Sequence, residues 1–201
     1  MKKILTTAIL CAGLVGFTAC DSFLDEEPKS SLTLDTYYKT SADIIGNVNY
    51  LYRDGAPDKM GNMTGAYRGS SLSVMNMVTG YFVNEYEGQE VDCSYARQLT
   101  RQNFTQSCCN YLTNDTWKGC YKSINVANAV IKYVDGVEMD GQAQYKAEAR
   151  FFRALNYFYL VKMFGDVPMI TEPTEDATLV EYPARTAASE VYKTVIIPDL
   201  Q

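Results

Sequence analysis

The chain of 201 residues carries a formal net charge of -6 and contains no histidine. An acidic chain is a poor partner for polyphosphates, so we expect no nucleic-acid binding. Because histidine is the commonest general base and metal ligand, its absence also disfavours hydrolytic and metal chemistry, and we expect neither a metal nor a cofactor.

The amino terminus has the pattern of a secretory leader. A short positive region at residues 2–3 precedes an apolar run at 4–19 that is too short to span a membrane comfortably. The run ends in the sequence FTAC, which resembles a bacterial lipobox closing at Cys20, although Leu is usual in place of Phe17. We predict a lipoprotein signal peptide at 1–19 and lipidation of Cys20; the alternative is an ordinary signal peptide followed by an accidental cysteine.

The next segment, residues 20–31, has little that could be buried and carries an acidic cluster before Pro28. It is predicted to be a lipidated acidic tether, a plain solvated linker by its composition; the alternative, an export tag, depends on the family resemblance given below. The remainder, 32–201, is predicted to be the folded α-helical domain.

Two helices are expected in the first half of that domain. The first follows Ser41, a suitable N-cap, with apolar residues at helical spacing through Tyr52. A glycine-punctuated loop then leads to a second helix at about 70–81. The apolar residues whose spacing predicts these two helices are Ile44, Ile45, Val48, Leu51, Leu72, Met75, Val78 and Phe82.

A long polar loop, at most with a short turn inside it, is expected at 84–106, because this stretch has no clear period. It combines carboxylates, among them Asp92, with tyrosines, a combination that glycosidases use, but nothing in the sequence fixes the separation of two carboxylates. Stacking of tyrosine on sugar rings, or simple packing of tyrosine in the fold, is the more ordinary use. Asp92, Tyr95 and Arg97 are the candidate ligand-binding residues, chosen from their chemistry alone; no catalytic residue is assigned.

A third helix is expected after Asn114, with an apolar stripe from Trp117 to Val134, and a fourth at 142–164. About seven residues join them, so they should form an antiparallel αα-hairpin like the unit of tetratricopeptide solenoids. The fourth helix is apolar on most of its circumference and should be buried between neighbours. The two apolar stripes that predict this burial are Phe152, Leu155, Tyr159 and Met163, and Phe151, Ala154, Phe158 and Val161.

The charged and terminating residues of the fourth helix also carry expectations. Arg150 and Arg153 should reach carboxylates or carbonyl groups, since unpaired guanidinium groups on a buried helix are costly. Gly165 is placed to take a positive φ at the helix C-cap, and Pro168 prevents the helix from restarting.

The last part of the chain is expected to be extended at 167–173 and then to form an acidic surface loop. Thr186 should cap a fifth helix, which Pro198 either kinks or ends because proline lacks the N–H that a continuing helix needs.

The cysteines predict no metal site. Cys11 would leave with the leader and Cys20 would be lipidated. The other four lack the spacing of a zinc knuckle, and their disulfide state stays open, with a buried free thiol the plainer interpretation for Cys120. These four are Cys93, Cys108, Cys109 and Cys120.

Several motifs together resemble the SusD/RagB family of outer-membrane nutrient-binding lipoproteins. They are the lipobox at Cys20; the pattern of Trp117, Tyr121, Ile124, Ala127 and Asn128; the stretch AEARFFRA from Ala147 continuing to Phe164-Gly165-Asp166-Val167-Pro168; and Arg185 followed by Glu190-Val191-Tyr192 and Asp199-Leu200.

The resemblance implies an all-α fold of tetratricopeptide-like helical hairpins with long irregular loops. It also implies a non-catalytic lipoprotein, anchored in the outer membrane and exposed at the cell surface, that binds glycan or another nutrient and delivers it to a SusC-like TonB-dependent transporter. Family members are more than twice this length, so 32–201 looks like an amino-terminal part. The alternative function is a helical scaffold that docks a protein partner without a nutrient site in this segment.

Overall fold

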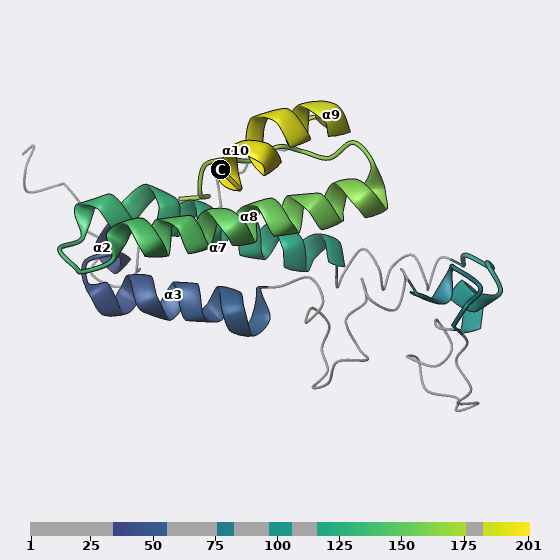
Figure 1. The fold of residues 1–201 in the computed structure, drawn as a ribbon, viewed down its shortest axis with the longest axis horizontal. Coiled ribbons are helices and arrows are strands. Elements are labelled where there is room, and N and C mark those ends of the chain that lie inside the picture. Colours follow the sequence, from purple (N-terminus) through teal and green to yellow (C-terminus); the bar gives the residue numbers. More distant parts are fainter. Residues whose placement is uncertain (1–33, 56–75, 83–96, 106–115, 176–182) are drawn as a thin grey trace, which may run out of the picture. The chain divides into compact units, whose positions relative to one another are not determined.

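The computed structural model describes residues 34–55, 76–82, 97–105, 116–175 and 183–201 (Figure 1). These residues belong to one compact unit, and their secondary structure is helical apart from an isolated β-bridge. The prediction of an all-α fold is therefore confirmed for the part of the chain that the structure describes.

The first helices are α2 (Leu34–Tyr37), which was not predicted, and α3 (Ser41–Asp54). The N-cap of α3 is Thr40, so the prediction of Ser41 was wrong by one residue. Thr40 and Asp43 form a capping box, in which the backbone N–H of Thr40 donates to Asp43 Oδ2 over 2.8 Å. This reciprocal pairing satisfies donors at the first turn, which explains why the helix begins there. The helix buries the predicted residues Ile44, Val48 and Leu51.

The helix expected at about 70–81 is described only from residue 76. Its described part leaves the helical state after Met77, so the predicted end at Tyr81 was wrong. The Thr79 hydroxyl donates to the carbonyl oxygen of Asn76 over 2.6 Å, and Gly80 has a φ of 79°, which an α-helix cannot accommodate.

The centre of the fold is the hairpin of α7 (Lys118–Tyr133) and α8 (Gln142–Phe164), joined through the 3₁₀ turn η3 (Val134–Gly136). The bounds of α8 are those predicted. The N-cap of α7 is Trp117; the predicted cap, Asn114, lies outside the described residues.

Contacts at both ends of the hairpin show that α7 and α8 are antiparallel, as predicted. At one end the rings of Trp117 and Phe164 meet edge to face with centroids 5.0 Å apart. At the other end Gln142 Nε2 donates to the carbonyl oxygen of Val134 over 3.2 Å.

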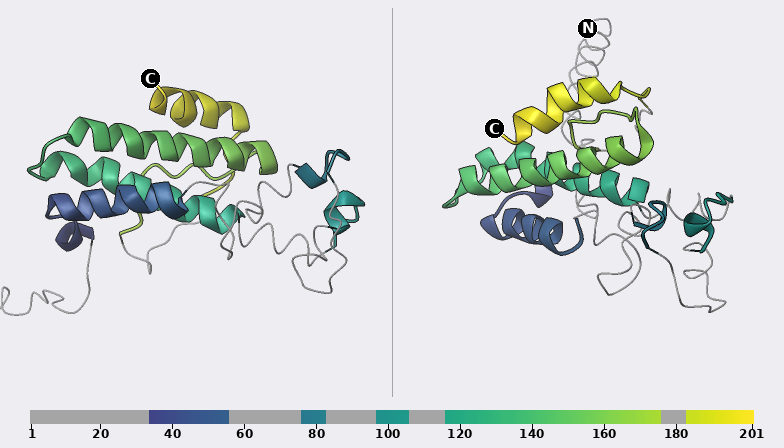
Figure 2. Two further views of the ribbon diagram at one scale, coloured as in Figure 1. Left: turned by 60° about the horizontal axis from the view of Figure 1, so that its bottom comes forward. Right: turned by 45° about the vertical axis from the view of Figure 1, so that its right-hand side comes forward.

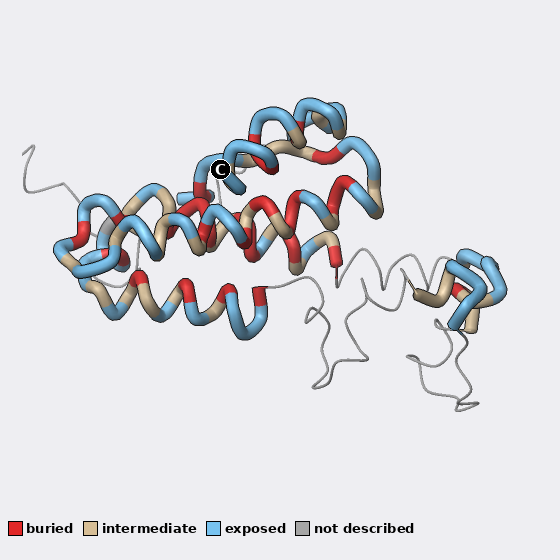
Figure 3. Tube along the Cα trace, viewed as in Figure 1, coloured by how far each residue is buried: buried red, intermediate tan, exposed pale blue. Residues whose placement is uncertain are grey.

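Buried positions recur along both helices of this hairpin (Figure 3), and the buried apolar residues form two clusters. The first joins α2 and α3 to the end of α7 and the start of α8. The second joins the start of α7 and the end of α8 to the carboxyl-terminal helix. The first contains Ile44, Val48, Leu51, Ala127, Val130, Val134, Ala149 and Phe152; the second contains Cys120, Ile124, Ala154, Tyr157, Leu160, Val161, Val167, Val191, Val195 and Ile196.

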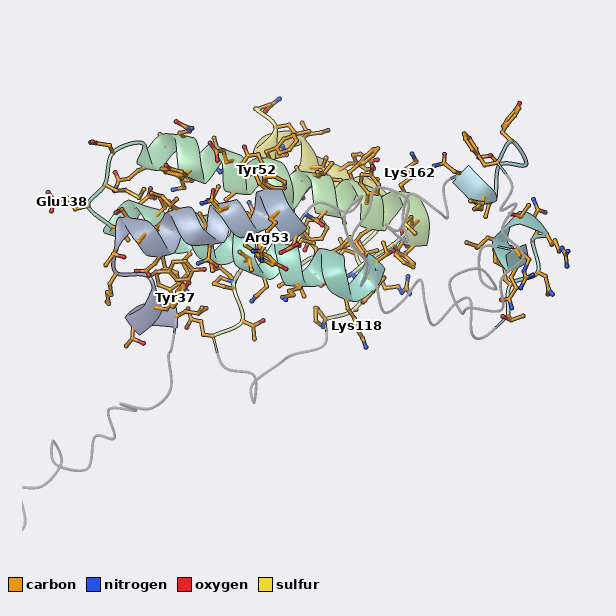
Figure 4. All side chains as sticks on the ribbon, turned by 90° about the horizontal axis from the view of Figure 1, so that it is seen from below. Tyr37, Tyr52, Arg53, Lys118, Glu138 and Lys162 are labelled. Carbon is orange, nitrogen blue, oxygen red and sulfur yellow. The ribbon has the colours of Figure 1, made fainter. Side chains whose placement is uncertain are left out.

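One face of α8 is not buried, contrary to the prediction for this helix. Phe151 and Phe158 are 48% and 37% exposed, although they belong to one of the two apolar stripes. The buried face of α8 instead includes Asn156 and Tyr157, both of which are fully buried. Figure 4 shows Tyr52 reaching from α3 toward α8, where its ring meets Phe152 edge to face at 4.8 Å.

Gly165 ends α8 with a φ of 70°, as predicted, and the chain then turns back along the hairpin. Val167 forms an antiparallel bridge with Thr186, each backbone N–H donating to the other's carbonyl oxygen. Thr186 is therefore not the helix cap, and that prediction was wrong. Ala187 occupies the N-cap position, and Asp166 supplies the capping oxygen, because its Oδ1 accepts the backbone N–H of Ala188 over 2.9 Å.

The carboxyl-terminal helix runs through α9 (Ala188–Val191), the π-helical turn η5 (Tyr192–Ile196) and α10 (Ile197–Asp199), beside α8 (Figure 2). Proline lacks the N–H of an ordinary helical turn. Here the wider π turn precedes Pro198, with the N–H of Ile197 bonded to the carbonyl oxygen of Tyr192, and the helix ends one residue after the proline.

Candidate functional site

The residues predicted to carry function are mostly outside the described part of the chain. Cys20, Asp92 and Tyr95 lie there, as does the sequence cluster of carboxylates around Asp92. Arg97 is described: it is partly buried and takes part in an interaction within the protein. The structure thus neither brings these four residues together nor separates them.

A short helical turn at 97–100 carries an exposed tip that the sequence did not single out. The backbone N–H of Asn103 donates to the carbonyl oxygen of Gln98 over 2.8 Å, and Gln102 has a φ of 52°. A left-handed conformation is uncommon for a residue other than glycine, and such residues gather at functional sites. The sequence does not predict this left-handed residue, because residues 97–105 contain no glycine, the usual sign of a positive φ.

The side chains at this tip have the chemistry of sugar recognition. Arg101, Gln102 and Asn103 are exposed, and Phe104 is 56% exposed. An aromatic face packs on the apolar face of a sugar ring, while amides and guanidinium groups bond to hydroxyls. Leu99, on the same turn, is fully buried and anchors it.

A second described segment, 76–82, meets this turn. The Thr100 hydroxyl donates to Met77 Sδ over 3.6 Å, across 23 positions of sequence. The segment ends in Tyr81 and Phe82, which are 90% and 54% exposed. We call the exposed set the aromatic–amide surface; it consists of Tyr81, Phe82, Arg101, Gln102, Asn103 and Phe104.

A buried polar network crosses the bundle between the two apolar clusters. Arg153 donates from Nε and Nη2 to the two carboxylate oxygens of Asp199, over 2.7 and 2.8 Å. Its Nη1 donates to Asn128 Oδ1 over 2.9 Å, so one guanidinium joins α7, α8 and α10. The expectation that Arg153 reaches a carboxylate is confirmed. Arg150 is exposed and has no hydrogen-bond or ion-pair partner among the described residues, so the same expectation was wrong for it.

The predicted extended stretch after α8 is held along α7 by side chains one or two turns apart. The Tyr121 hydroxyl donates to the carbonyl oxygen of Pro168 over 2.7 Å. Asn128 Nδ2 donates to the carbonyl oxygens of Ile170 and Glu172, and Asn125 Oδ1 accepts the N–H of Thr174. At the end of the stretch, Glu175 pairs with Lys132 and accepts the Tyr133 hydroxyl, which lowers the pKa of Glu175.

The buried tyrosines are neutral hydrogen-bonding groups. Tyr157 donates its hydroxyl to the carbonyl oxygen of Ile170 over 2.8 Å and accepts the N–H of the same residue over 2.7 Å. Burial raises the pKa of Tyr157 to about 12, and burial likewise raises the pKa of the Cys120 thiol to about 12. Cys120 is fully buried in the second apolar cluster, and the other three cysteines lie outside the described residues.

Neither a metal site nor a membrane span is found among the residues that the structure describes. They contain no group of three or more histidine, cysteine, aspartate or glutamate side chains that could hold an ion. None of their helices is both long and apolar enough to cross a bilayer.

Residues 22–201 match a SusD-like family model described as starch-binding and associating with the outer membrane. The chain is 29% identical to SusD-like protein P2 of Formosa agariphila. The match covers all of this chain and 37% of the length of that protein. It is 27% identical to a SusD-like protein of Bacteroides ovatus, over 90% of this chain and 30% of the other.

A solved SusD superfamily protein from Parabacteroides distasonis has a similar structure. It superposes with a TM-score of 0.58 at 25% identity, over 78% of this chain and 32% of its own. This likeness supports the tetratricopeptide-like helical fold. The chain spans about a third of the length of these relatives.

Proposed function

Since this chain belongs to the SusD-like family, described as starch-binding and associating with the outer membrane, we propose that it binds glycan at the cell surface. The observation that carries the proposal is the aromatic–amide surface: two described segments, joined by the contact of Thr100 with Met77, expose aromatic rings, amides and a guanidinium. The family is one of binding proteins rather than enzymes, and we assign no catalytic residue.

The anchoring of the protein is part of this proposal. Residues 1–19 would direct export, and Cys20 would carry the acyl chains that hold the mature protein in the outer membrane. Stable anchoring needs two hydrophobic signals, and two or three chains on one cysteine meet that need. The acidic segment up to residue 31 would separate the lipid from the fold.

The partner in uptake would be a SusC-like TonB-dependent transporter. A nutrient held by a binding protein that is tethered beside a transporter meets it at a raised effective concentration, so modest affinity suffices. The rigid α7–α8 hairpin would serve as the scaffold for this assembly. Co-purification with a barrel transporter from native outer membranes supports this arrangement, whereas isolation of the protein alone, or from the inner membrane, contradicts it.

A second candidate function is a scaffold that docks a protein partner and binds no nutrient through this segment. The observation in its favour is the exposed aromatic face of α8, with Phe151 and Phe158, beside the exposed ring of Tyr52. A scaffold of this kind would bind the transporter but give no signal with any glycan.

Titration of the purified protein separates the two functions. Maltoheptaose, soluble starch and a panel of other polysaccharides are added while heat is measured by calorimetry. Saturable heat with a glycan, lost when Phe104 is replaced by Ala, supports glycan binding. Transporter binding without any glycan signal supports the scaffold instead.

A further inference from the structure

One face of α8 carries five residues at the spacing of a coiled-coil seam. They are Glu148, Phe151, Leu155, Phe158 and Lys162, which follow one another at intervals of three, four, three and four residues. Because such intervals stay close to the period of a helix, the five side chains lie in one stripe, the pattern by which two helices interlock. We call these five residues the α8 seam.

The α8 seam is the side of the helix that neighbouring helices leave open. Its two phenylalanines are 48% and 37% exposed, and its other three residues are exposed or half-buried. The fully buried residues of α8, such as Tyr157 and Leu160, lie on its other faces. Single apolar side chains at a surface are ordinary, but aligned aromatic residues mark a contact with another molecule.

The two ends of the α8 seam carry opposite charges, and neither charge belongs to an ion pair among the described residues. Glu148 accepts a hydrogen bond from Gln144 Nε2 over 2.8 Å. The Lys162 ammonium lies 5.6 Å from the centroid of the Phe158 ring. Since both charged residues are seven positions from Leu155, each lies about 10 Å along the helix from the centre of the seam.

This arrangement makes the α8 seam complementary to a second copy of itself. In an antiparallel pair of α8 helices related by a two-fold axis near Leu155, Glu148 lies beside the partner's Lys162 and Phe151 lies beside the partner's Phe158. Every contact then occurs twice, as in any interface that a two-fold axis generates. A parallel pair would instead bring like charges together at both ends, which is unfavourable.

We propose that this chain forms a dimer through the α8 seam, with the two copies of α8 antiparallel. The order of charges along the seam identifies the occupant, because a second copy has the matching order by symmetry. Two helix faces bury less area than a standard protein interface, so we expect a weak dimer with a Kd on the order of 10 µM. The proposal goes beyond glycan binding and does not depend on it.

Two charge reversals test the pairing in the purified full chain. Lys162→Glu and Glu148→Lys each place like charges at both ends of the dimer, so each variant alone should associate roughly tenfold more weakly than the wild type. An equimolar mixture of the two variants has complementary charges again and should associate as the wild type does. Sedimentation velocity from about 1 to about 200 µM measures the association. Recovery in the mixture also shows that each variant is folded.

A pair of truncations tests the apolar part of the α8 seam. Phe158→Ala removes two rings from each dimer and should weaken association by roughly tenfold or more. The matched control is Leu200→Ala, because Leu200 is apolar and 59% exposed but lies outside the seam. This control should associate as the wild type does. Thermal midpoints of both variants show whether each remains folded.

Other outcomes overturn the inference. A wild type that stays monomeric over the whole concentration range rejects self-association and leaves the α8 seam to a different protein. A mixture that associates more tightly than the wild type indicates parallel pairing, because only the mixture then brings opposite charges together. Equal association of the wild type and all variants, or a loss shared with Leu200→Ala, places the contact elsewhere. None of these outcomes depends on glycan affinity, so a failure here is distinct from a failure of the proposed function.

Discussion

Arg153 and Asp199, 46 positions apart in sequence, form a two-bond ion pair with side chains only 12% and 6% exposed. The pair lies between the two apolar clusters and ties the last turn of the chain to the middle of α8. Because Arg153 also bonds to Asn128, one side chain links three helices.

We expect the loss of this guanidinium to be strongly destabilising. Arg153→Met leaves the carboxylate of Asp199 buried without its partner, and breaking a buried pair in this way costs about 3–5 kcal/mol. Arg150→Met, three residues earlier on the same helix but exposed, should change stability by less than about 0.5 kcal/mol. Urea denaturation of the two variants measures the difference, and equal losses would show that the ion pair contributes little.

Two glycine substitutions should have opposite effects. Gly165 has a φ of 70°, where an L side chain is strained, so Gly165→Ala should cost about 1–3 kcal/mol although nothing blocks its Cβ. Gly46 lies inside α3 with open space around it, so Gly46→Ala should stabilise by up to about 1 kcal/mol. Relative to the wild type, the urea midpoint should fall for Gly165→Ala and rise for Gly46→Ala. Midpoints that shift in the same direction would contradict the assigned backbone conformations.

Stability should fall in alkali. The pKa of Tyr157 is raised by burial from 10.0 to about 12, so the folded protein holds this proton more tightly than the unfolded chain. The resulting stabilisation is complete below about pH 10 and is lost as the pH rises from there toward 12. Urea midpoints measured at steps from pH 8 to 11 should decline at the upper end.

The variant Tyr157→Phe tests the origin of that decline. It removes the titrating hydroxyl together with its two hydrogen bonds to Ile170, so it should be less stable at neutral pH but show a shallower loss in alkali. The raised pKa of Cys120 acts in the same direction, so some slope remains. An unchanged slope in Tyr157→Phe would assign the alkaline loss to other groups.

If Cys20 is lipidated, its replacement should move the protein out of the outer-membrane fraction. Cells fed an alkyne analogue of palmitate should label the wild-type protein, and the label should be found in the outer-membrane fraction. Cys20→Ala should be unlabelled and leave that fraction, because a single cysteine carries the acyl chains. Wild-type protein that is exported but unlabelled would instead indicate an ordinary signal peptide.

The helices were predictable where local signals agree with packing. In α8 the apolar spacing, the positive φ available to Gly165 and the following proline all define the same carboxyl end, and the structure has that end. The cap of α3 was misplaced by one residue because Ser41 and Thr40 are both good caps, and only the bond from Thr40 to Asp43 decides between them.

The errors have tertiary causes. Thr186 has the chemistry of a cap, but its backbone is engaged by Val167, 19 positions away, and a carboxylate from the other side of the turn caps the helix. Phe151 has the spacing of a core residue, yet the sequence does not reveal that neighbouring helices cover only part of α8. In the candidate site, the left-handed Gln102 has no sequence signature, so the sequence did not single out the exposed tip; the role of Asp92, Tyr95 and Arg97 stays a prediction.

The central claim is that the aromatic–amide surface binds glycan, and one calorimetric comparison tests it most directly. Wild type, Phe104→Ala and a matched control, Phe151→Ala, are titrated with maltoheptaose, soluble starch and the polysaccharide panel. Both phenylalanines are about half exposed, at 56% and 48%, but only Phe104 belongs to the surface. Loss of a stacking ring should weaken binding by about 1 kcal/mol or more, roughly tenfold, in Phe104→Ala while Phe151→Ala binds as the wild type does. Equal affinity of all three proteins, or loss only in Phe151→Ala, would contradict the assignment.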